Sequence, residues 1–574
     1  MRRFYFFCFL SFIIYFSVVS ICVGLENNFS FDLVSPHSVE GPVGFTLKEP
    51  SWVYFHSSSD GKLEVRDSFG KQFLVVLRDG DGFFELPAGV YHVSNQWSDS
   101  LRIRKVGVTL YYSIAGTKFD MSETEMVRIP TNPREGGRAG MYLYSYQWLR
   151  KHILGPFNMV ANGRKLEVKQ WQSEGRKQLF GLGLGVPETL YENWCTVVSK
   201  HCTNGILLDE FIVPAGQKDT KNVQFGYTSP GRGFDDVTQD SIKKFSKKFP
   251  NQRFCAWLGF PWDAKGSDVK KLLDTIIESN GYIFWESYSF PNDPKAEIRH
   301  RYTSRVKGFL SIRPDAMKYF IVSPCTFEQS ARNVNVDFKV WLDIQMHMLA
   351  TDPDYEGIGG ISMWASYYTD PEILRWFSTL VRYYVIEGNS AMLSKQLGYQ
   401  LYPEILANAD WSKNLDYWQI SEAAPGSIRV IDRKVSGIKK VYSPFSDHLL
   451  QFTEIKGKTN SVRQQLKNLI PGKLYVLRSK VANPETDKYE HSAVQFHLKN
   501  VEIISTIERA MHDFGAEKKG PCYDTFTIIF KPLSSDPCEL EIADSRHENI
   551  LEAKTLFLDG VNIAPYFPQK EKIK

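Results

Sequence analysis

Two stretches of the chain share one form: GILLDEFIV at Gly205–Val213 and GYIFWESYSF at Gly281–Phe290. Each begins as a short apolar run, which is typical of a buried strand. Each then places carboxylates at its end, Asp209 and Glu210 in the first run and Glu286 in the second. Similar runs alternate with amphipathic segments of helix length on either side. This repeated strand-then-helix spacing predicts a parallel sheet.

Eight strand-length runs are found between about residues 125 and 388. They are Met126–Pro130, Phe157–Asn162, Gln178–Gly185, Gly205–Phe211, Arg253–Phe260, Tyr282–Ser287, Lys318–Ser323 and Gly359–Ser366. Eight such strands with helices between them fit a closed (β/α)₈ TIM barrel, whose active site lies at the carboxyl ends of the strands. An open doubly wound sheet is the alternative fold.

The regions on both sides of the predicted barrel are all-β. Before it, short alternating runs are divided by Gly, Asp and Ser turns, which predicts a β-sandwich. After it, three phrases occur in order: NADWSKNLDYWQI (Asn408–Ile420), LIPGKLYVLRSKV (Leu469–Val481) and LFLDGVNIAPY (Leu556–Tyr566). They resemble three segments of carbohydrate-binding jelly-roll modules with a galactose-binding-like fold. The first phrase resembles the opening turn of these modules, the second a turn followed by a strand, and the third their closing strand. The resemblance implies a C-terminal jelly roll.

The predicted organisation is therefore multidomain, α/β in the middle and all-β at both ends. It consists of a signal peptide (1–24), an N-terminal β-sandwich domain (25–124), the barrel (125–388), a linker (389–407) and the jelly-roll domain (408–574). The signal peptide is indicated by Met1-Arg2-Arg3, a long apolar run and small residues near Gly24. It predicts a secreted, periplasmic or cell-surface protein, with a retained membrane anchor as the rival.

Charge and cysteine content narrow the choice of partners. Residues 1–24 contain two arginines and no acidic residue, so their removal lowers the net charge from +4 to +2. That balance gives no reason to expect nucleic acid or a membrane as a partner. In an exported protein Cys195–Cys202 and Cys522–Cys538 are plausible disulfides, while Cys255 and Cys325 fit buried free thiols. No cysteine or histidine pattern has the spacing of a metal site, so neither a metal nor another cofactor is expected.

The predicted barrel resembles the (β/α)₈ glycoside hydrolase superfamily, by its arrangement and by the Asp-Glu pair at the end of strand four. Glycosidases need a carboxylic acid and a second carboxylate. The resemblance implies that Glu210 is the acid or acid/base, with Glu286 on strand six and Asp209 as the other catalytic candidates. Strand seven, where the largest clan of retaining enzymes keeps its nucleophile, ends in Ser323-Pro324. An inverting pair, or joint action of Asp209 and Glu210, therefore stays open beside retention.

Aromatic residues gather at the same strand ends and predict platforms for sugar rings. The substrate-binding candidates are Trp257, Trp262, Trp285, Tyr288, Trp364 and Tyr367, with Arg232 and Asp235 in the loop YTSPGRGFDD (Tyr227–Asp236).

These features together predict a secreted glycosidase that acts on a polysaccharide or complex glycan, with possible association with the cell surface. Two other functions stay open. One is a non-catalytic glycan-binding protein on a degenerate barrel, and the other is a polysaccharide lyase. A serine esterase and a zinc protease are disfavoured, because the chain has neither a G-x-S-x-G nor an H-E-x-x-H motif.

Overall fold

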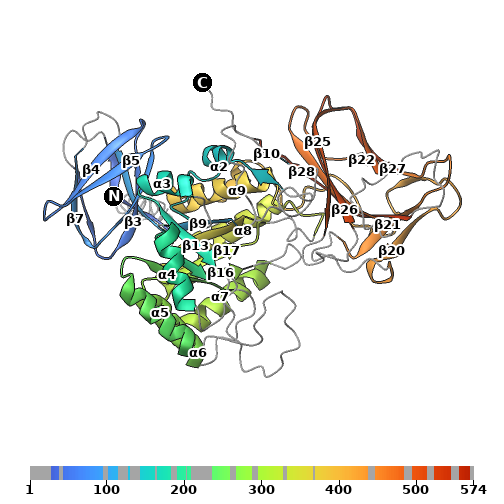
Figure 1. Cartoon of the computed structure of the whole chain (residues 1–574). Coiled ribbons are helices and arrows are strands. Elements are labelled where there is room, and N and C mark those ends of the chain that lie inside the picture. Colours follow the sequence, from blue (N-terminus) through green and yellow to red (C-terminus); the bar gives the residue numbers. More distant parts are fainter. Residues whose placement is uncertain are drawn as a thin grey trace, which may run out of the picture.

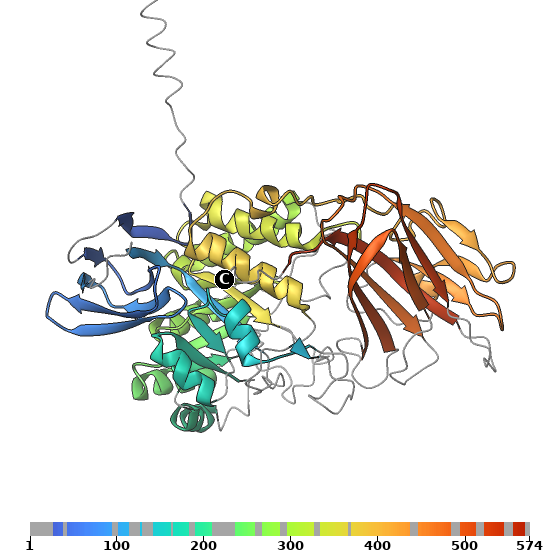
Figure 2. The same cartoon turned by 90° about the horizontal axis from the view of Figure 1, so that it is seen from above.

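The molecule consists of three bodies in a row, with the barrel between two β domains (Figures 1 and 2). The computed structural model describes residues 27–37, 43–94, 101–113, 127–128, 142–161, 165–182, 190–201, 203–208, 236–258, 267–287, 295–326, 333–365, 369–436, 446–483, 494–512, 522–544 and 555–568. The predicted signal peptide lies outside these residues. None of the helices in the described ranges is long and apolar enough to cross a bilayer.

The N-terminal body is built from two four-stranded antiparallel sheets, as predicted. Their strands, in spatial order, are β1 (Phe31–His37), β8 (Leu101–Val106), β3 (Ser51–His56) and β6 (Asp81–Leu86), then β2 (Val43–Leu47), β7 (Gly89–Ser94), β4 (Gly61–Asp67) and β5 (Gln72–Leu77). In β4 the buried Leu63 and Val65 alternate with more exposed polar residues, as expected for one core-facing side of a strand.

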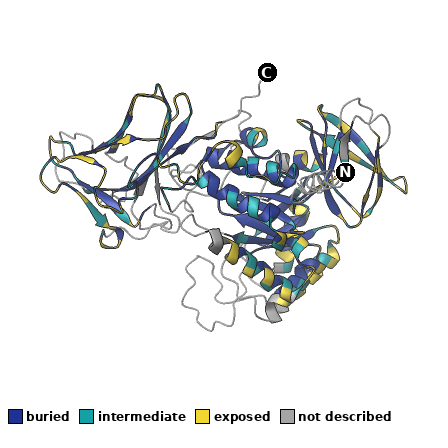
Figure 3. Cartoon of the chain, turned by 180° about the vertical axis from the view of Figure 1, so that it is seen from behind, coloured by how far each residue is buried: buried dark blue, intermediate teal, exposed yellow. Residues whose placement is uncertain are grey.

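The middle body is a closed barrel of eight parallel strands, which confirms the predicted TIM barrel. In chain order the strands are β9 (Val108–Ser113), β12 (Met159–Ala161), β13 (Lys177–Leu182), β14 (Gly205–Leu208), β15 (Arg253–Leu258), β16 (Ile283–Ser287), β17 (Phe320–Pro324) and β18 (Gly360–Ala365). The strands are mostly buried, and exposed residues gather on the helices around them (Figure 3).

Helices connect the barrel strands and form its outer layer. They are α2 (Tyr146–His152), α3 (Lys165–Ser173), α4 (Leu190–His201), α5 (Asp236–Lys248), α6 (Ser267–Glu278), α7 (Lys295–Ile312), α8 (Phe338–Thr351) and α9 (Pro371–Leu380). A π-helical turn, η6 (Val381–Ile386), continues α9, and α10 (Leu393–Gln396) follows. Asp370 caps α9, since its side chain accepts the Ile373 backbone N–H at 2.9 Å.

The first barrel strand was predicted in the wrong place. Val127 and Arg128 form β10 (Val127–Arg128), which pairs with β11 (Leu143–Tyr144) in a separate two-stranded ribbon. Strand one is instead β9, which closes the barrel between β12 and β18. The barrel therefore begins within the range 25–124 that was assigned to the sandwich. A short run of alternating apolar and polar residues fits a sandwich strand and a barrel strand equally well. Only the strands with which it pairs show to which sheet it belongs.

The C-terminal body is a second antiparallel β-sandwich, as predicted. One sheet has the order β19 (Gln419–Ser421), β22 (Ser461–Leu466), β27 (Cys538–Asp544), β24 (Val494–Lys499). The other has the order β20 (Ile428–Asp432), β21 (His448–Thr453), β28 (Thr555–Pro565), β23 (Tyr475–Asn483), β26 (Cys522–Pro532), β25 (Val501–His512). Buried side chains of both sheets form one hydrophobic core.

The predicted linker 389–407 is not a simple spacer. It contains α10, and its last part belongs to the C-terminal core through the buried Ile405 and Leu406. The Gln464 side chain also bonds both backbone groups of Ala407, at 2.7 and 3.0 Å. The C-terminal unit therefore includes residues before Asn408.

A fragment that begins at Tyr402 should consequently be more stable than one that begins at Asn408. Loss of two buried aliphatic side chains is expected to lower the free energy of unfolding by about 3 kcal/mol or more. Urea unfolding of residues 402–574 and 408–574, followed by circular dichroism, measures the difference. Equal midpoints of urea unfolding for the two fragments would contradict a C-terminal unit that begins before Asn408.

The predicted disulfides of Cys195 and Cys538 are absent. Both thiols are free and buried, as are Cys255 and Cys325, whose prediction as buried thiols is confirmed. Cys202 lies outside the described residues. Cys522 pairs in its strand ladders with Asn483 and His512, so it belongs to a different sheet from Cys538.

The two β domains contact opposite ends of the barrel. Glu85 of the N-terminal domain forms ion pairs with Arg253 and Lys177, which begin β15 and β13. Asn562 of the C-terminal domain donates to the Val334 carbonyl at 2.7 Å, beyond the end of β17. The amino-terminal end of the barrel thus faces the N-terminal sandwich, and the carboxyl ends of the strands face the C-terminal domain (Figure 1).

Candidate functional site

The strand register identifies which side chains face the barrel interior. Tyr112 on strand one and Trp257 on strand five lie on opposite sides of the barrel, yet their rings are 5.0 Å apart between centroids. Both therefore point inward. Trp257 pairs with Phe284, so Glu286, two residues further along the same strand, also points inward. Ladder partners in a parallel sheet face the same side. Ser323, the partner of Glu286, and Trp364, the partner of Tyr112, therefore also point inward and belong to the same inner layer of side chains.

Glu286 lies at the carboxyl end of strand six and is partly exposed. This confirms its predicted place in the barrel. The indole Nε1–H of Trp257 donates to Glu286 Oε1 at 2.6 Å. A hydrogen bond from a fixed donor stabilises the ionised form of a carboxylate and orients it. The arrangement suits a carboxylate that acts as base or nucleophile.

Trp257 is itself held rigidly. Its ring stacks on Phe284 at 5.7 Å and tilts against Tyr112, and it is fully buried. Below it on the same strand, burial raises the pKa of the Cys255 thiol to about 12, as expected for a dry barrel interior. Full burial makes Trp257 a group that positions Glu286. It is not the open sugar platform that the sequence predicted.

Trp285 is the clearest correction among the predicted substrate-binding residues. Its side chain points out of the barrel, toward α7 and the next strand. The ring packs against Tyr302 at 5.4 Å and Phe320 at 5.6 Å. Since neighbours in a strand face opposite sides, the inward Glu286 requires an outward Trp285. Trp285 therefore belongs to the core between sheet and helix.

Trp364 keeps the position that was predicted for it. It lies inside the barrel at the end of strand eight, and 8% of its surface is exposed. Two further residues of this layer were missed. Tyr112 was missed because its strand was assigned to the sandwich, and Ser323 because a serine at a strand end carries no signal. Ser323 Oγ is buried and has no hydrogen-bond partner in the described part of the chain.

Seven predicted site residues lie outside the described residues: Asp209, Glu210, Arg232, Asp235, Trp262, Tyr288 and Tyr367. Asp209 and Glu210 directly follow β14, which is strand four of the barrel, as predicted. Among the described residues, no group of three or more His, Cys, Asp or Glu side chains could hold a metal ion.

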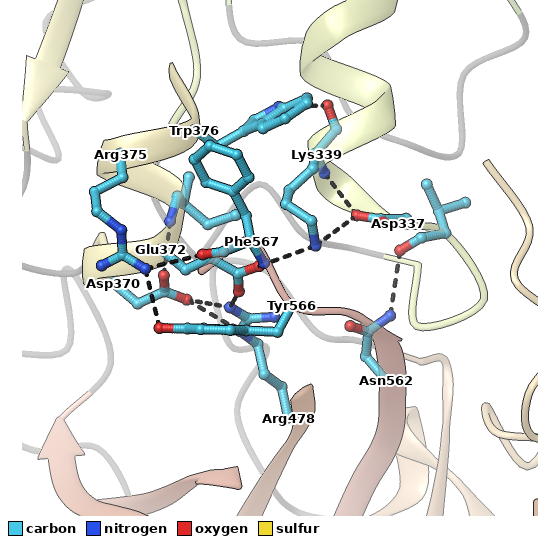
Figure 4. Close-up of polar contacts among 12 residues, drawn as sticks. Asp337, Lys339, Asp370, Glu372, Arg375, Trp376, Arg478, Asn562, Tyr566 and Phe567 are labelled. Atoms are coloured by element: carbon cyan, nitrogen blue, oxygen red, sulfur yellow. Dashed lines mark hydrogen bonds and ion pairs between the residues drawn. The ribbon is translucent and has the colours of Figure 1, made fainter. Parts of the chain in front are cut away.

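A buried ionic network joins the barrel to the C-terminal domain at this end (Figure 4). Arg478 of β23 donates from Nε to Asp370 Oδ2 at 3.0 Å, and its Nη2 bonds Glu372 as well. Glu372 Oε1 also accepts the Phe567 backbone N–H at 2.6 Å and lies 3.2 Å from Lys339 Nζ. The C-terminal domain thus holds the first turn of α9, the helix that follows strand eight.

Charge balance explains how this network tolerates burial. Burial alone would raise the pKa of Asp370, but the positive charge of Arg478 keeps it below its ordinary value. Burial would likewise lower the pKa of Lys339, and the charges of Asp337 and Glu372 raise it instead. Lys339 Nζ lies 3.1 Å from Asp337 Oδ1. Each buried charge therefore has an opposite partner, as burial requires.

The C-terminal domain also lines space next to the site. A cavity between the two bodies is lined by Thr326, just beyond strand seven, and by Lys480 and Thr525 of the C-terminal domain. Thr326 Oγ1 donates to the Trp364 carbonyl at 3.2 Å. The domain is therefore part of the surroundings of the barrel's carboxyl end.

No protein-family model matches this chain, and no curated protein does. Solved structures that are similar to it include a cycloisomaltooligosaccharide glucanotransferase of Paenibacillus sp. complexed with cycloisomaltoheptaose. It has 7% identity, covers 94% of this chain and 72% of its own, and has a TM-score of 0.36. A GH18 chitinase from Pseudoalteromonas aurantia has 12% identity over 48% of this chain and 99% of its own, with a TM-score of 0.30.

A part of the chain is also similar to TmCBM61, a structure solved in complex with β-1,4-galactotriose. The identity is 11% over 28% of this chain and 98% of that one, and the TM-score is 0.18. Because all these identities and scores are low, the assignment of the barrel rests on the strand pairing of the chain itself.

Proposed function

We propose that this protein is a glycoside hydrolase that cleaves a polysaccharide or complex glycan at the carboxyl end of its barrel. The observation that carries the proposal is Glu286, an inward-facing carboxylate at the end of strand six, held by the Trp257 indole at 2.6 Å. Active sites of (β/α)₈ enzymes lie at this end of the barrel.

The chemistry assigns different roles to the two carboxylates. Glu286, stabilised in its ionised form by Trp257, is suited to act as nucleophile or as the base that activates water. Glu210, which follows strand four in the sequence, is proposed as the acid that protonates the leaving oxygen. Asp209 is the alternative partner, because it precedes Glu210 directly.

The surrounding residues supply what a sugar needs for binding. Trp364 keeps some exposed aromatic surface at the end of strand eight, on which the apolar face of a sugar ring packs, and its ladder partner Tyr112 is buried beneath the surface.

We further propose that the chain is exported through residues 1–24. This rests on the charged start, apolar run and small residues of that segment. N-terminal sequencing of the mature protein checks it, and a start close to Leu25 is expected. An intact Met1 on the exported protein would contradict cleavage.

Glu210→Gln tests the catalytic proposal. The amide cannot donate the proton that the leaving group requires, so release of reducing sugar is expected to fall by at least ~10²-fold. The assay measures reducing ends from xylan, laminarin, chitosan, galactan and dextran. Glu278→Gln, an exposed glutamate at the end of α6, is the matched control and should keep full activity.

Two results would count against the proposal. Wild-type turnover in Glu210→Gln would remove Glu210 from the reaction, and Asp209→Asn would then identify whether its neighbour acts instead. Lack of hydrolysis of every glycan by the wild-type protein would favour a non-catalytic barrel.

A further inference from the structure

A groove separate from the barrel site lies where the C-terminal domain meets the barrel. It encloses about 640 Å³. One side comes from Val334 and Asn335, beyond strand seven, and the rest comes from the C-terminal body and the segment that leads into it. The groove is named here by two of its residues, Tyr402 and Tyr417.

Two exposed aromatic rings line this one groove. In the described part of the chain four aromatic side chains are exposed: Phe31 (54%), Phe69 (95%), Tyr402 (53%) and Tyr417 (62%). Both tyrosines of this set belong to the groove, and both phenylalanines belong to the N-terminal domain. Tyr417 also adopts φ 74°, a strained conformation for an aromatic residue, which the turn before β19 imposes.

The groove combines these rings with polar groups. Exposed Glu404, Lys413, Lys467 and Asn468 lie around it. Its floor is apolar and comes from the C-terminal core, with Ile405, Ala409 and Val561 fully or nearly buried. Flat rings beside charged and amide groups match a ligand whose ring faces are apolar and whose rim carries hydroxyls.

The walls of the groove are fixed before any ligand binds. Asn408 donates to the Asn414 carbonyl at 2.8 Å and the Asp416 carbonyl at 3.1 Å, which closes the turn that carries Tyr417. Asn468 donates to the carbonyl of Glu404, two residues after Tyr402, at 3.2 Å. A preorganised site loses less entropy when it binds.

We propose that the Tyr402–Tyr417 groove is a second saccharide-binding site, distinct from the barrel site, which holds a polysaccharide chain by stacking on the two tyrosine rings. The groove chemistry selects a polyhydroxylated ligand with flat apolar faces. The choice of a polysaccharide among such ligands rests on the proposed hydrolase function.

The test is affinity electrophoresis of the full chain in native gels that contain hydroxyethylcellulose, xylan, laminarin, galactan or dextran. All variants are made in the Glu286→Gln background, so that the gel polysaccharide is not degraded. The parent should be retarded by at least one of these probes. Tyr402→Ala/Tyr417→Ala should weaken that binding by about tenfold or more, the loss expected for two stacked rings.

Phe31→Ala/Phe69→Ala is the matched control, since it removes from the N-terminal domain two rings that are at least as exposed as the two tyrosines. It should migrate like the parent. Equal retardation of the tyrosine variant and the parent would overturn the proposal, and so would a parent that no probe retards. Hydrolysis by the wild-type protein is measured separately, so failure of the catalytic proposal and failure of the groove give different results.

Discussion

Replacing Glu286 by glutamine is expected to lower the turnover of a glycan substrate by at least ~10³-fold. The amide has nearly the same shape and its oxygen still accepts the Trp257 indole N–H, so the barrel should fold unchanged. An amide has no negative charge, however, and serves neither as nucleophile nor as general base. Initial rates on the best glycan of the panel, with thermal unfolding as a folding check, measure the effect.

Trp257→Phe separates the positioning role from the catalytic one. It keeps a ring against Tyr112 and Phe284 but removes the donor to Glu286. Loss of one hydrogen bond to a charged group should lower turnover by about tenfold and change its pH profile. Substrate affinity should change less, because the buried indole is not a sugar platform.

The stereochemistry follows from the role of Glu286. If Glu286 is a nucleophile, Glu286→Ala with azide should form a glycosyl azide, and NMR of the wild-type reaction should first show the retained anomer. If Glu286 activates water instead, the inverted anomer appears first. Full activity in Glu286→Ala would contradict both roles.

Replacing Arg478 by alanine is expected to destabilise the contact between the barrel and the C-terminal domain by about 3–5 kcal/mol. Arg478 is the partner of two buried carboxylates, Asp370 and Glu372, and both would lose an opposite charge (Figure 4). Urea unfolding of the full chain measures the loss. Calorimetry should also show the barrel and C-terminal transitions further apart.

Arg463→Ala is the control for this effect. Arg463 forms an exposed ion pair with Glu541 in the same domain, at 2.7 Å, and its loss should cost less than about 1 kcal/mol. Arg478→Lys should lose less stability than Arg478→Ala and more than Arg463→Ala. An ammonium group keeps the charge but does not reproduce the forked contact of the guanidinium group. Equal effects of Arg478→Ala and Arg463→Ala would show that the network contributes little.

The pH dependence has a defined sign. Asp370 has a lowered pKa in the folded protein, so its ion pair stabilises the fold above the ordinary carboxylate pKa of about 4. This contribution is lost as the pH falls and Asp370 becomes protonated. The difference in the free energy of unfolding between the wild type and Arg478→Ala should therefore become smaller at acidic pH.

Local patterns were sufficient to predict the architecture. Period-two alternation marked the strands of both sandwiches, and apolar runs followed by helices marked barrel strands two to eight. They also placed Glu286 on strand six. These signals are local, because the periods of strands and helices appear among residues that are close in the sequence. No contact between distant residues is needed to detect them.

Long-range pairing decided the rest. Val108–Ser113 reads as one more sandwich strand, and only its ladders with β12 and β18, remote in the sequence, make it strand one of the barrel. The direction of each side chain also could not be read from the sequence, because adjacent residues of one strand face opposite sides of the sheet. Glu286 faces the interior with Trp257, while the adjacent Trp285 faces α7, because a single residue of register exchanges the two sides of a strand.

The sequence by itself determined three domains, the alternation of strands and helices in the middle one and a carboxylate at the end of its sixth strand, since these depend on local periodicity. The tertiary structure alone decided the closure of the barrel, the indole that holds Glu286, the ionic network at Arg478 and the groove of Tyr402 and Tyr417. Each of these joins residues far apart in the chain or on different domains. Their proximity depends on the packing of whole elements, which no local pattern records.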